Sequence, residues 1–208
     1  MTSLPLLSGF ALGASLIIAI GAQNAFVFRQ GLRREHTFTV AALCAGIDAA
    51  LIAAGTGGFG TLVSHFPAIT QIAAWGGAAF LAVYGVLALR SAIHPGHLEA
   101  DDAPTPPPSR TLRATIATTL AVSLLNPHVY LDTIVLLGSL AAQYAMPGRA
   151  HFALGAGCAS VVWFFSLAFG ARLLAPIFER PAAWRVLDLA IAGIMLWIAA
   201  TLVLGQIG

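Results

Sequence analysis

The sequence predicts an all-α integral membrane protein with six transmembrane helices. Hydrophobic residues make up 59% of the 208 residues, charged residues make up only 9%, and the mean hydropathy is +0.88. A soluble domain carries roughly 25% charged residues, so ten basic and eight acidic side chains are too few to cover a soluble surface. Long stretches without charge recur along the chain, and a spanning helix needs about 20 apolar residues. The net charge of +2 argues against a nucleic-acid partner, and we expect a lipid bilayer as the surroundings.

Charge-free stretches give the positions of the six spans. Their predicted ranges are 4–28, 37–62, 68–89, 115–140, 152–171 and 186–204. The prolines and acids of residues 91–112 predict a solvated linker between the third and fourth spans. We therefore expect two three-helix units, 1–90 and 113–208. An odd-numbered unit repeated once is necessarily inverted, which is a common plan among transporters.

The distribution of arginine predicts the orientation. Nine of the ten basic residues lie in the connections that follow the first, third and fifth spans. They are Arg29, Arg33, Arg34, Arg90, Arg110, Arg113, Arg172, Arg180 and Arg185. Since connections rich in basic residues stay in the cytoplasm, the linker should be cytoplasmic and both termini should face outward.

Two acids fall deep inside predicted spans, and a third, Asp188, lies near the entrance of the sixth. Asp48 lies near the middle of the second span, and Asp132 lies within the fourth. A charge at the centre of a span costs at least ~2.5–3.5 kcal/mol on insertion scales. Intramembrane acids usually face the interior of a helix bundle and mark the path of an ion or substrate. Both acids are therefore candidate functional residues, with a structural hydrogen-bonding role as the alternative.

The fourth span contains a predicted helix break. Pro127 has no N–H group and should release the carbonyl of Ser123. Such a free carbonyl within a membrane needs a partner or a polar cavity. Polar residues surround the proline: in a continuous helix His128 would share a face with Asp132, while Asn126, Tyr130 and Thr133 would share another. His128 could orient Asp132, shuttle protons or satisfy the broken backbone.

The first span contains a similar polar break at Gly21, Gln23 and Asn24. Glycine permits unwinding, and the two amide side chains can serve exposed backbone, a substrate or a neighbouring helix. The resemblance of this break to the one in the fourth span favours an internal repeat. Gly55, Gly57, Gly58 and Gly60 should allow close helix packing, and the adjacent Trp163, Phe164 and Phe165 indicate packing in several directions.

These motifs give the chain a resemblance to a known family. Gly-Ala-Gln-Asn-Ala-Phe-Val at 21–27, Gln-Gly-Leu-Arg-Arg at 30–34, Asp48 and Asn-Pro-His-Val-Tyr-Leu-Asp-Thr at 126–133 carry it. The sequence resembles the LysE family of bacterial amino-acid exporters, especially the branch of lysine and arginine exporters. Ala22 replaces a proline often found there. The resemblance implies export of arginine or lysine from the cytoplasm across the bacterial inner membrane, with no enzymatic activity and no cofactor.

A physical interpretation agrees with this resemblance. A dibasic amino acid brings one carboxylate, which suits helix N-termini at the breaks, and two cationic groups, which suit Asp48 and Asp132. The predicted substrate-binding residues are Gln23, Asn24, Asp48, Asn126, His128, Tyr130, Asp132 and Thr133, with Gly21 and Pro127 forming the breaks. Substrate and proton could compete for the two acids during alternating access.

Two alternative functions fit part of the pattern. A divalent-metal exporter would need more oxygen or thiolate ligands than two acids supply, so no metal site is predicted. An intramembrane aspartyl protease could use Asp48 and Asp132 as a dyad, but the residues around them lack the pattern of that family. Arginine and lysine are not distinguished by the sequence, and a homodimer is left open.

Overall fold

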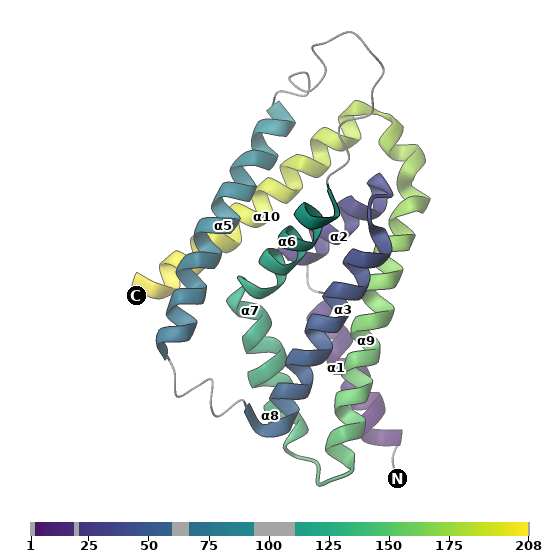
Figure 1. Cartoon of the computed structure of the whole chain (residues 1–208), viewed down its shortest axis with the longest axis vertical. Coiled ribbons are helices and arrows are strands. Elements are labelled where there is room, and N and C mark those ends of the chain that lie inside the picture. Colours follow the sequence, from purple (N-terminus) through teal and green to yellow (C-terminus); the bar gives the residue numbers. More distant parts are fainter. Residues whose placement is uncertain (1–2, 19–20, 60–66, 94–110, 208) are drawn as a thin grey trace.

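The computed structural model describes residues 3–18, 21–59, 67–93 and 111–207, and these form helices joined by short turns (Figure 1). The helices before the linker are α1 (Ser3–Ile17), α2 (Ala22–Arg33), α3 (Thr37–Ala54), a π-helical turn η1 (Gly55–Phe59), and α5 (Pro67–Ile93). Those after it are α6 (Leu112–Leu124), α7 (Pro127–Tyr130), a π-helical stretch η2 (Leu131–Leu136), α8 (Leu137–Ala141), α9 (Gly148–Gly170), a 3₁₀ stretch η3 (Ala171–Glu179) and α10 (Pro181–Ile207). The all-α prediction is confirmed, while most of the predicted linker 91–112 lies outside the described residues.

Four of the described helices are long and apolar enough to cross a membrane: Thr37–Gly58, Trp75–Ile93, Gly148–Phe178 and Ala182–Gly205. A fifth span results if α1 and α2 count as one, and these two helices are bent by 82°. The predicted fourth span is divided into shorter apolar helices, Leu112–Leu124 and Leu131–Ala141. Length and composition therefore support four to five spans in the described part of the chain, and the count of six stays a prediction.

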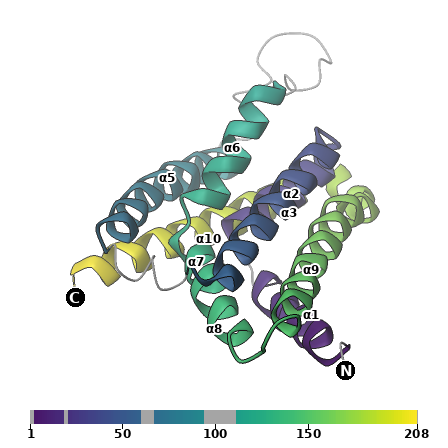
Figure 2. The same cartoon turned by 60° about the horizontal axis from the view of Figure 1, so that its bottom comes forward.

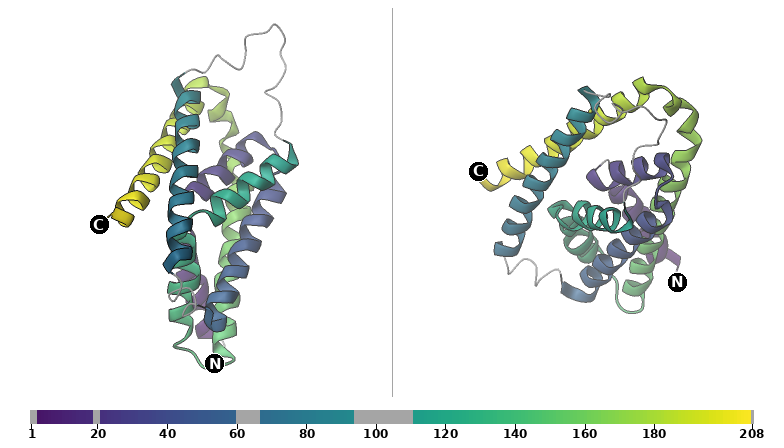
Figure 3. Two further views of the ribbon diagram at one scale, coloured as in Figure 1. Left: turned by 60° about the vertical axis from the view of Figure 1, so that its left-hand side comes forward. Right: turned by 45° about the horizontal axis from the view of Figure 1, so that its top comes forward.

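Helices α5 and α10 pack along each other at one side of the molecule (Figures 1 and 2). Their shared core includes Leu81 of α5 with Ile191 and Met195 of α10, and α2 adds Ala22 to it. The right-hand view of Figure 3 shows this pair set against the remaining helices. The pair therefore forms one wall of the molecule and reaches the broken first span.

Helix α9 packs along both α1 and α3. Glycines allow the close approach to α1: Gly9 faces the backbone carbonyl of Phe152, and Gly155 of α9 faces that of Leu6, with no room for a Cβ atom at either position. Small residues let helix backbones approach closely within a membrane. Helix α9 is consequently a central element that contacts both the first and the second predicted spans.

A second close contact holds η2 and α8 against the end of α3. A Cβ atom on Gly55 would lie 2.6 Å from the carbonyl oxygen of Thr133, and one on Gly138 would lie 2.7 Å from that of Gly55. The predicted close packing is confirmed for Gly55. Gly57 and Gly58 face open space, and Gly60 lies outside the described residues. This contact places the segment that carries Asp132 beside the helix that carries Asp48.

Candidate functional site

A cavity of about 270 Å³ lies where the two broken segments meet. Seven of the ten residues predicted for the site line it: Gly21, Gln23, Asn24, Asp48, Asn126, Asp132 and Thr133. Its apolar lining consists of Leu16, Ile17, Val129, Leu137, Phe164 and Ile198. Ligand pockets for drug-sized molecules measure roughly 300–1,000 Å³, so this cavity suits a single small molecule. Both intramembrane acids therefore reach one largely apolar space.

Of the other three predicted residues, Tyr130 does not line the cavity among the described side chains. Tyr130 is half-buried and faces elsewhere. Pro127 begins α7, as the predicted break requires, and His128 follows it. The side chains of Pro127 and His128 lie outside the described part of the chain, so the three roles considered for His128 stay open.

The first break separates α1, which ends at Ile17, from α2, which begins at Ala22. The Asn24 Nδ2 atom donates a hydrogen bond of 2.8 Å to the carbonyl oxygen of Ile17, across the break. The Trp163 Nε1 atom of α9 donates to Asn24 Oδ1 at 3.1 Å. Gly21 itself is extended, with φ −137° and ψ 177°, so its torsion does not require glycine. Asn24 thus satisfies broken backbone, which is one of the roles expected of the amides.

The second break separates α6, which ends at Leu124, from α7, and it is bridged in the same manner. The Tyr130 hydroxyl donates a hydrogen bond of 2.7 Å to the carbonyl oxygen of Leu124. The predicted free carbonyl was that of Ser123, one residue earlier. Tyr130 was expected to share the face of Asn126 and Thr133, but its hydroxyl serves the backbone instead and the cavity is lined by Val129 at that level.

The helix after the second break is π-helical over η2. The Leu137 N–H group donates to the carbonyl oxygen of Asp132, five residues earlier, which is the π pattern. Asp132 and the adjacent Thr133 both line the cavity. The prediction that they lie on different faces assumed a regular α-helix, whereas this stretch is π-helical and both residues reach the cavity. Single π turns often occur at functional sites.

Asp48 lies on α3 and is 3% exposed. The Ser160 hydroxyl of α9 donates a hydrogen bond of 3.0 Å to Asp48 Oδ2. Buried polar groups need such partners because an unpaired one loses its solvation without compensation. Ser160 was not predicted as a site residue, since a lone serine within an apolar stretch gives no signal of its own.

Gln23 adds an amide donor to the cavity, beside Asp48. Its side chain is 8% exposed, and its Nε2 atom has no hydrogen-bond partner within the described residues. It stands in the first turn of α2, whose N-cap Gly21 makes no side-chain capping bond. The first N–H groups of a helix have no partner within the helix and form the positive end of its dipole. The N-terminus of α2 therefore favours a negatively charged group.

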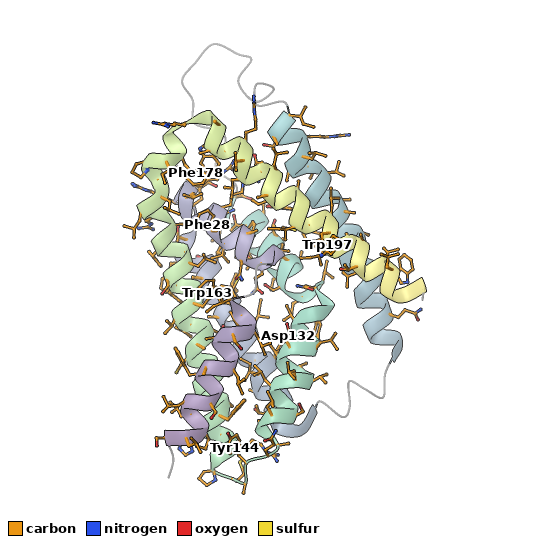
Figure 4. The ribbon with its side chains drawn as sticks, turned by 180° about the vertical axis from the view of Figure 1, so that it is seen from behind. Phe28, Asp132, Tyr144, Trp163, Phe178 and Trp197 are labelled. Atoms are coloured by element: carbon orange, nitrogen blue, oxygen red, sulfur yellow. The ribbon has the colours of Figure 1, made fainter. Side chains whose placement is uncertain are left out.

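The site thus combines groups of opposite character. The N-terminus of α2 and Gln23 offer hydrogen-bond donors, while Asp48 and Asp132 offer carboxylates. Figure 4 shows Asp132 on the segment after the second break and Trp163 on α9. Such a cavity can hold a molecule that carries both a carboxylate and cationic groups.

Sequence reasoning also missed part of the apolar wall. Phe164 was expected only to pack against neighbours, yet it lines the cavity together with Ile198 of α10. Within the described residues no group of three or more His, Cys, Asp or Glu side chains is placed to hold a metal ion.

Comparison with known proteins finds sequence similarity along nearly the whole chain. The model of the LysE type translocator family matches residues 14–206. A protein of Mycobacterium tuberculosis, named as a candidate amino-acid transporter, is 48% identical over 185 residues, or 89% of this chain and 90% of that protein. YggA of Aeromonas salmonicida, with a similar name, is 43% identical over 201 residues, or 97% of this chain and 96% of YggA.

A third relative has a more specific name. The arginine exporter protein ArgO of Salmonella enteritidis is 45% identical over 192 residues, or 92% of this chain and 89% of ArgO. No solved structure matches the chain. The extent of the family match and of these identities establishes what the motifs at 21–34 and 126–133 had indicated. The chain belongs to the LysE type translocator family and is a membrane transporter rather than an enzyme.

Proposed function

We propose that this transporter exports basic amino acids, L-arginine or L-lysine, from the cytoplasm. The observation that carries the proposal is the convergence of Asp48 from α3 and Asp132 from η2 on one cavity sized for a small molecule. Among the described residues, none with a basic side chain lines that cavity. Two carboxylates in a largely apolar space favour a cationic ligand over a neutral one.

The opposite character of these groups suggests how the substrate is oriented. Its α-carboxylate would accept hydrogen bonds from the first N–H groups of α2 and from Gln23 Nε2, which lines the cavity. Its cationic groups would lie at Asp48 and Asp132. Asn126 and Thr133 complete the polar lining. The name of the relative ArgO favours arginine, and lysine carries the same set of charges.

The transport cycle we propose is alternating access between two inverted three-helix units, 1–90 and 113–208. The parallel between the breaks supports this repeat: Asn24 bonds the end of α1 and Tyr130 bonds the end of α6. In this scheme the linker is cytoplasmic, both termini face the outside of the bacterial inner membrane, and protons compete with substrate for the two acids. Broken helices at a repeat interface are typical of substrate sites in secondary transporters.

Uptake into inside-out membrane vesicles tests the substrate class. Vesicles with the wild-type chain should accumulate radiolabelled arginine or lysine above empty-vector vesicles and should not accumulate threonine, a neutral control. Cells fed basic dipeptides should likewise be relieved of growth inhibition when they express the chain. Transport of threonine with no transport of either basic amino acid would overturn the proposal.

A further inference from the structure

Helix α9 makes two hydrogen bonds to the candidate site, three residues apart. Ser160 donates to Asp48 of α3, and Trp163 donates to Asn24 of α2. Residues three apart in a helix lie on the same face. One face of α9 therefore contacts both the acid and the first break.

The hydrogen bond between Ser160 and Asp48 is fully buried. Ser160 is 0% exposed and Asp48 is 3% exposed, and 3.0 Å separates the hydroxyl oxygen from Oδ2. A hydrogen bond donated to a carboxylate limits the rotation of that group and favours its ionised form. Hydrogen bonds to charged groups are also stronger than those between neutral groups. The bond holds Oδ2, and Gln23 also interacts with the Asp48 carboxylate, which lines the cavity.

The contact at Trp163 acts through the backbone. The indole N–H holds the Asn24 carbonyl oxygen, and the amide of Asn24 in turn holds the Ile17 carbonyl at the end of α1. Asn24 cannot rotate without losing both bonds. The direction of the first N–H groups of α2 is therefore set from α9.

We propose that Ser160 and Trp163 are positioning residues for the substrate: Ser160 fixes the Asp48 carboxylate, which receives the side-chain cation of the substrate, and Trp163 fixes the helix end that receives the substrate carboxylate. Neither residue lines the cavity, so each acts through its partner. This inference rests on the proposed function. The two residues have different roles. Loss of Ser160 alters recognition of the side-chain cation, whereas loss of Trp163 alters recognition of the α-carboxylate, which every amino acid carries.

The test measures binding of arginine and of citrulline, its neutral isostere, to the purified full-length chain by calorimetry. Ser160→Ala should weaken arginine binding about two- to tenfold, the range for one hydrogen bond, and leave citrulline binding unchanged. Trp163→Phe should weaken both ligands by a similar factor. Ser166→Ala, at an exposed serine on the same helix, is the matched control and should change neither. Ser160→Cys keeps the volume with a weaker donor and should give a smaller loss of the same kind.

A double-mutant cycle with Asp48→Asn decides whether Ser160 acts through Asp48. In that background Ser160→Ala should have no further effect on the arginine-to-citrulline ratio. Equal loss of both ligands in Ser160→Ala, or an undiminished effect in the Asp48→Asn background, would overturn the inference and leave the proposed function intact. Full arginine preference in Asp48→Asn alone would instead contradict the assignment of Asp48 in the proposed function.

Discussion

Arg29 of α2 and Asp188 of α10 form an ion pair, with 3.2 Å between Nη1 and Oδ1 and side chains that are 13% and 6% exposed. Ser91 of α5 donates a hydrogen bond of 2.9 Å to the other carboxylate oxygen of Asp188. These contacts tie the α5–α10 pair to the second half of the broken first span. Arg29 was predicted to lie in a connection, and its place within α2 follows from this buried partner.

The ion pair leads to a prediction about stability. Asp188→Asn and Arg29→Gln should each destabilise the chain by about 3–5 kcal/mol, because each leaves one buried charge without its partner. The double variant should lose less than the sum of the two, since no lone charge remains. Thermal or denaturant unfolding in detergent measures the stability of the two single variants and of the double variant. Strict additivity would mean that the two charges do not interact.

The bridge across the second break leads to another prediction. Tyr130→Phe removes the hydroxyl that bonds the Leu124 carbonyl and leaves a partly buried acceptor unpaired, which costs about 0.5–1.5 kcal/mol. Tyr144→Phe, at another half-buried tyrosine, is the matched control and should cost less. The measurement is the melting temperature of each purified variant. An equal effect of the two substitutions would show that the bridge does not stabilise the break.

The contact between Gly55 and the η2–α8 segment predicts a steric effect. Gly55→Val would press a side chain against the backbone at Thr133 and Ile134, whereas Gly57→Val would enter open space. Overpacking typically costs about 1–3 kcal/mol. The valine at 55 should therefore lower the stability and reduce export, because Asp132 lies on the displaced segment. Comparable stability and export in the two valine variants would contradict this packing.

The orientation of the termini can be tested by labelling. Single cysteines at Thr2 and Gln206, in a background with Cys44 and Cys158 replaced by alanine, should react with a membrane-impermeant reagent in intact spheroplasts. This follows from the clustering of arginine in alternate connections. Protection of both positions until the membrane is permeabilised would reverse the predicted topology.

Much of the fold was predictable from composition, because charge-free stretches and a membrane's thickness leave few alternatives. The breaks were also predictable, since proline and clustered polar residues are costly within an apolar span unless the helix is interrupted there. The geometry of the breaks was not: the 82° bend and the π turn at η2 depend on packing against α9 and α3. That is why Tyr130 was assigned to the cavity although its hydroxyl bonds backbone.

The acids of the candidate site were predictable because an intramembrane carboxylate is costly and rare. Their partners were not. Ser160 bonds a residue 112 positions away, and Asp188 pairs with an arginine that the orientation rule places in a connection. A serine in an apolar helix and an acid near a helix end are both common in helical proteins. Only the spatial arrangement distinguishes these two residues from others of their type.

Charge recognition by Asp48 and Asp132 is the central claim, and both acids should be needed for binding but not for folding. Asp48→Asn and Asp132→Asn keep the shape of the side chain and remove its charge, so membrane abundance should be unchanged. Each should lose a charge-assisted contact worth roughly 1.5–3 kcal/mol, or about 10–150-fold in arginine affinity. The double variant should be little worse than the worse single one if the acids act as a unit.

The most direct measurement is the ratio of arginine to citrulline affinity in the wild-type chain and in the two Asn variants. Because the two ligands differ in the charge of the side chain and share the α-ammonium group, the ratio isolates what a carboxylate contributes to binding the side-chain cation. We expect a preference of at least about tenfold for arginine in the wild type, falling towards one in the variant that lacks the acid at the side-chain cation, whereas loss of the acid at the α-ammonium group should weaken both ligands alike. An arginine preference that persists in both Asn variants would contradict the assignment and leave Asp48 and Asp132 as structural hydrogen-bonding groups.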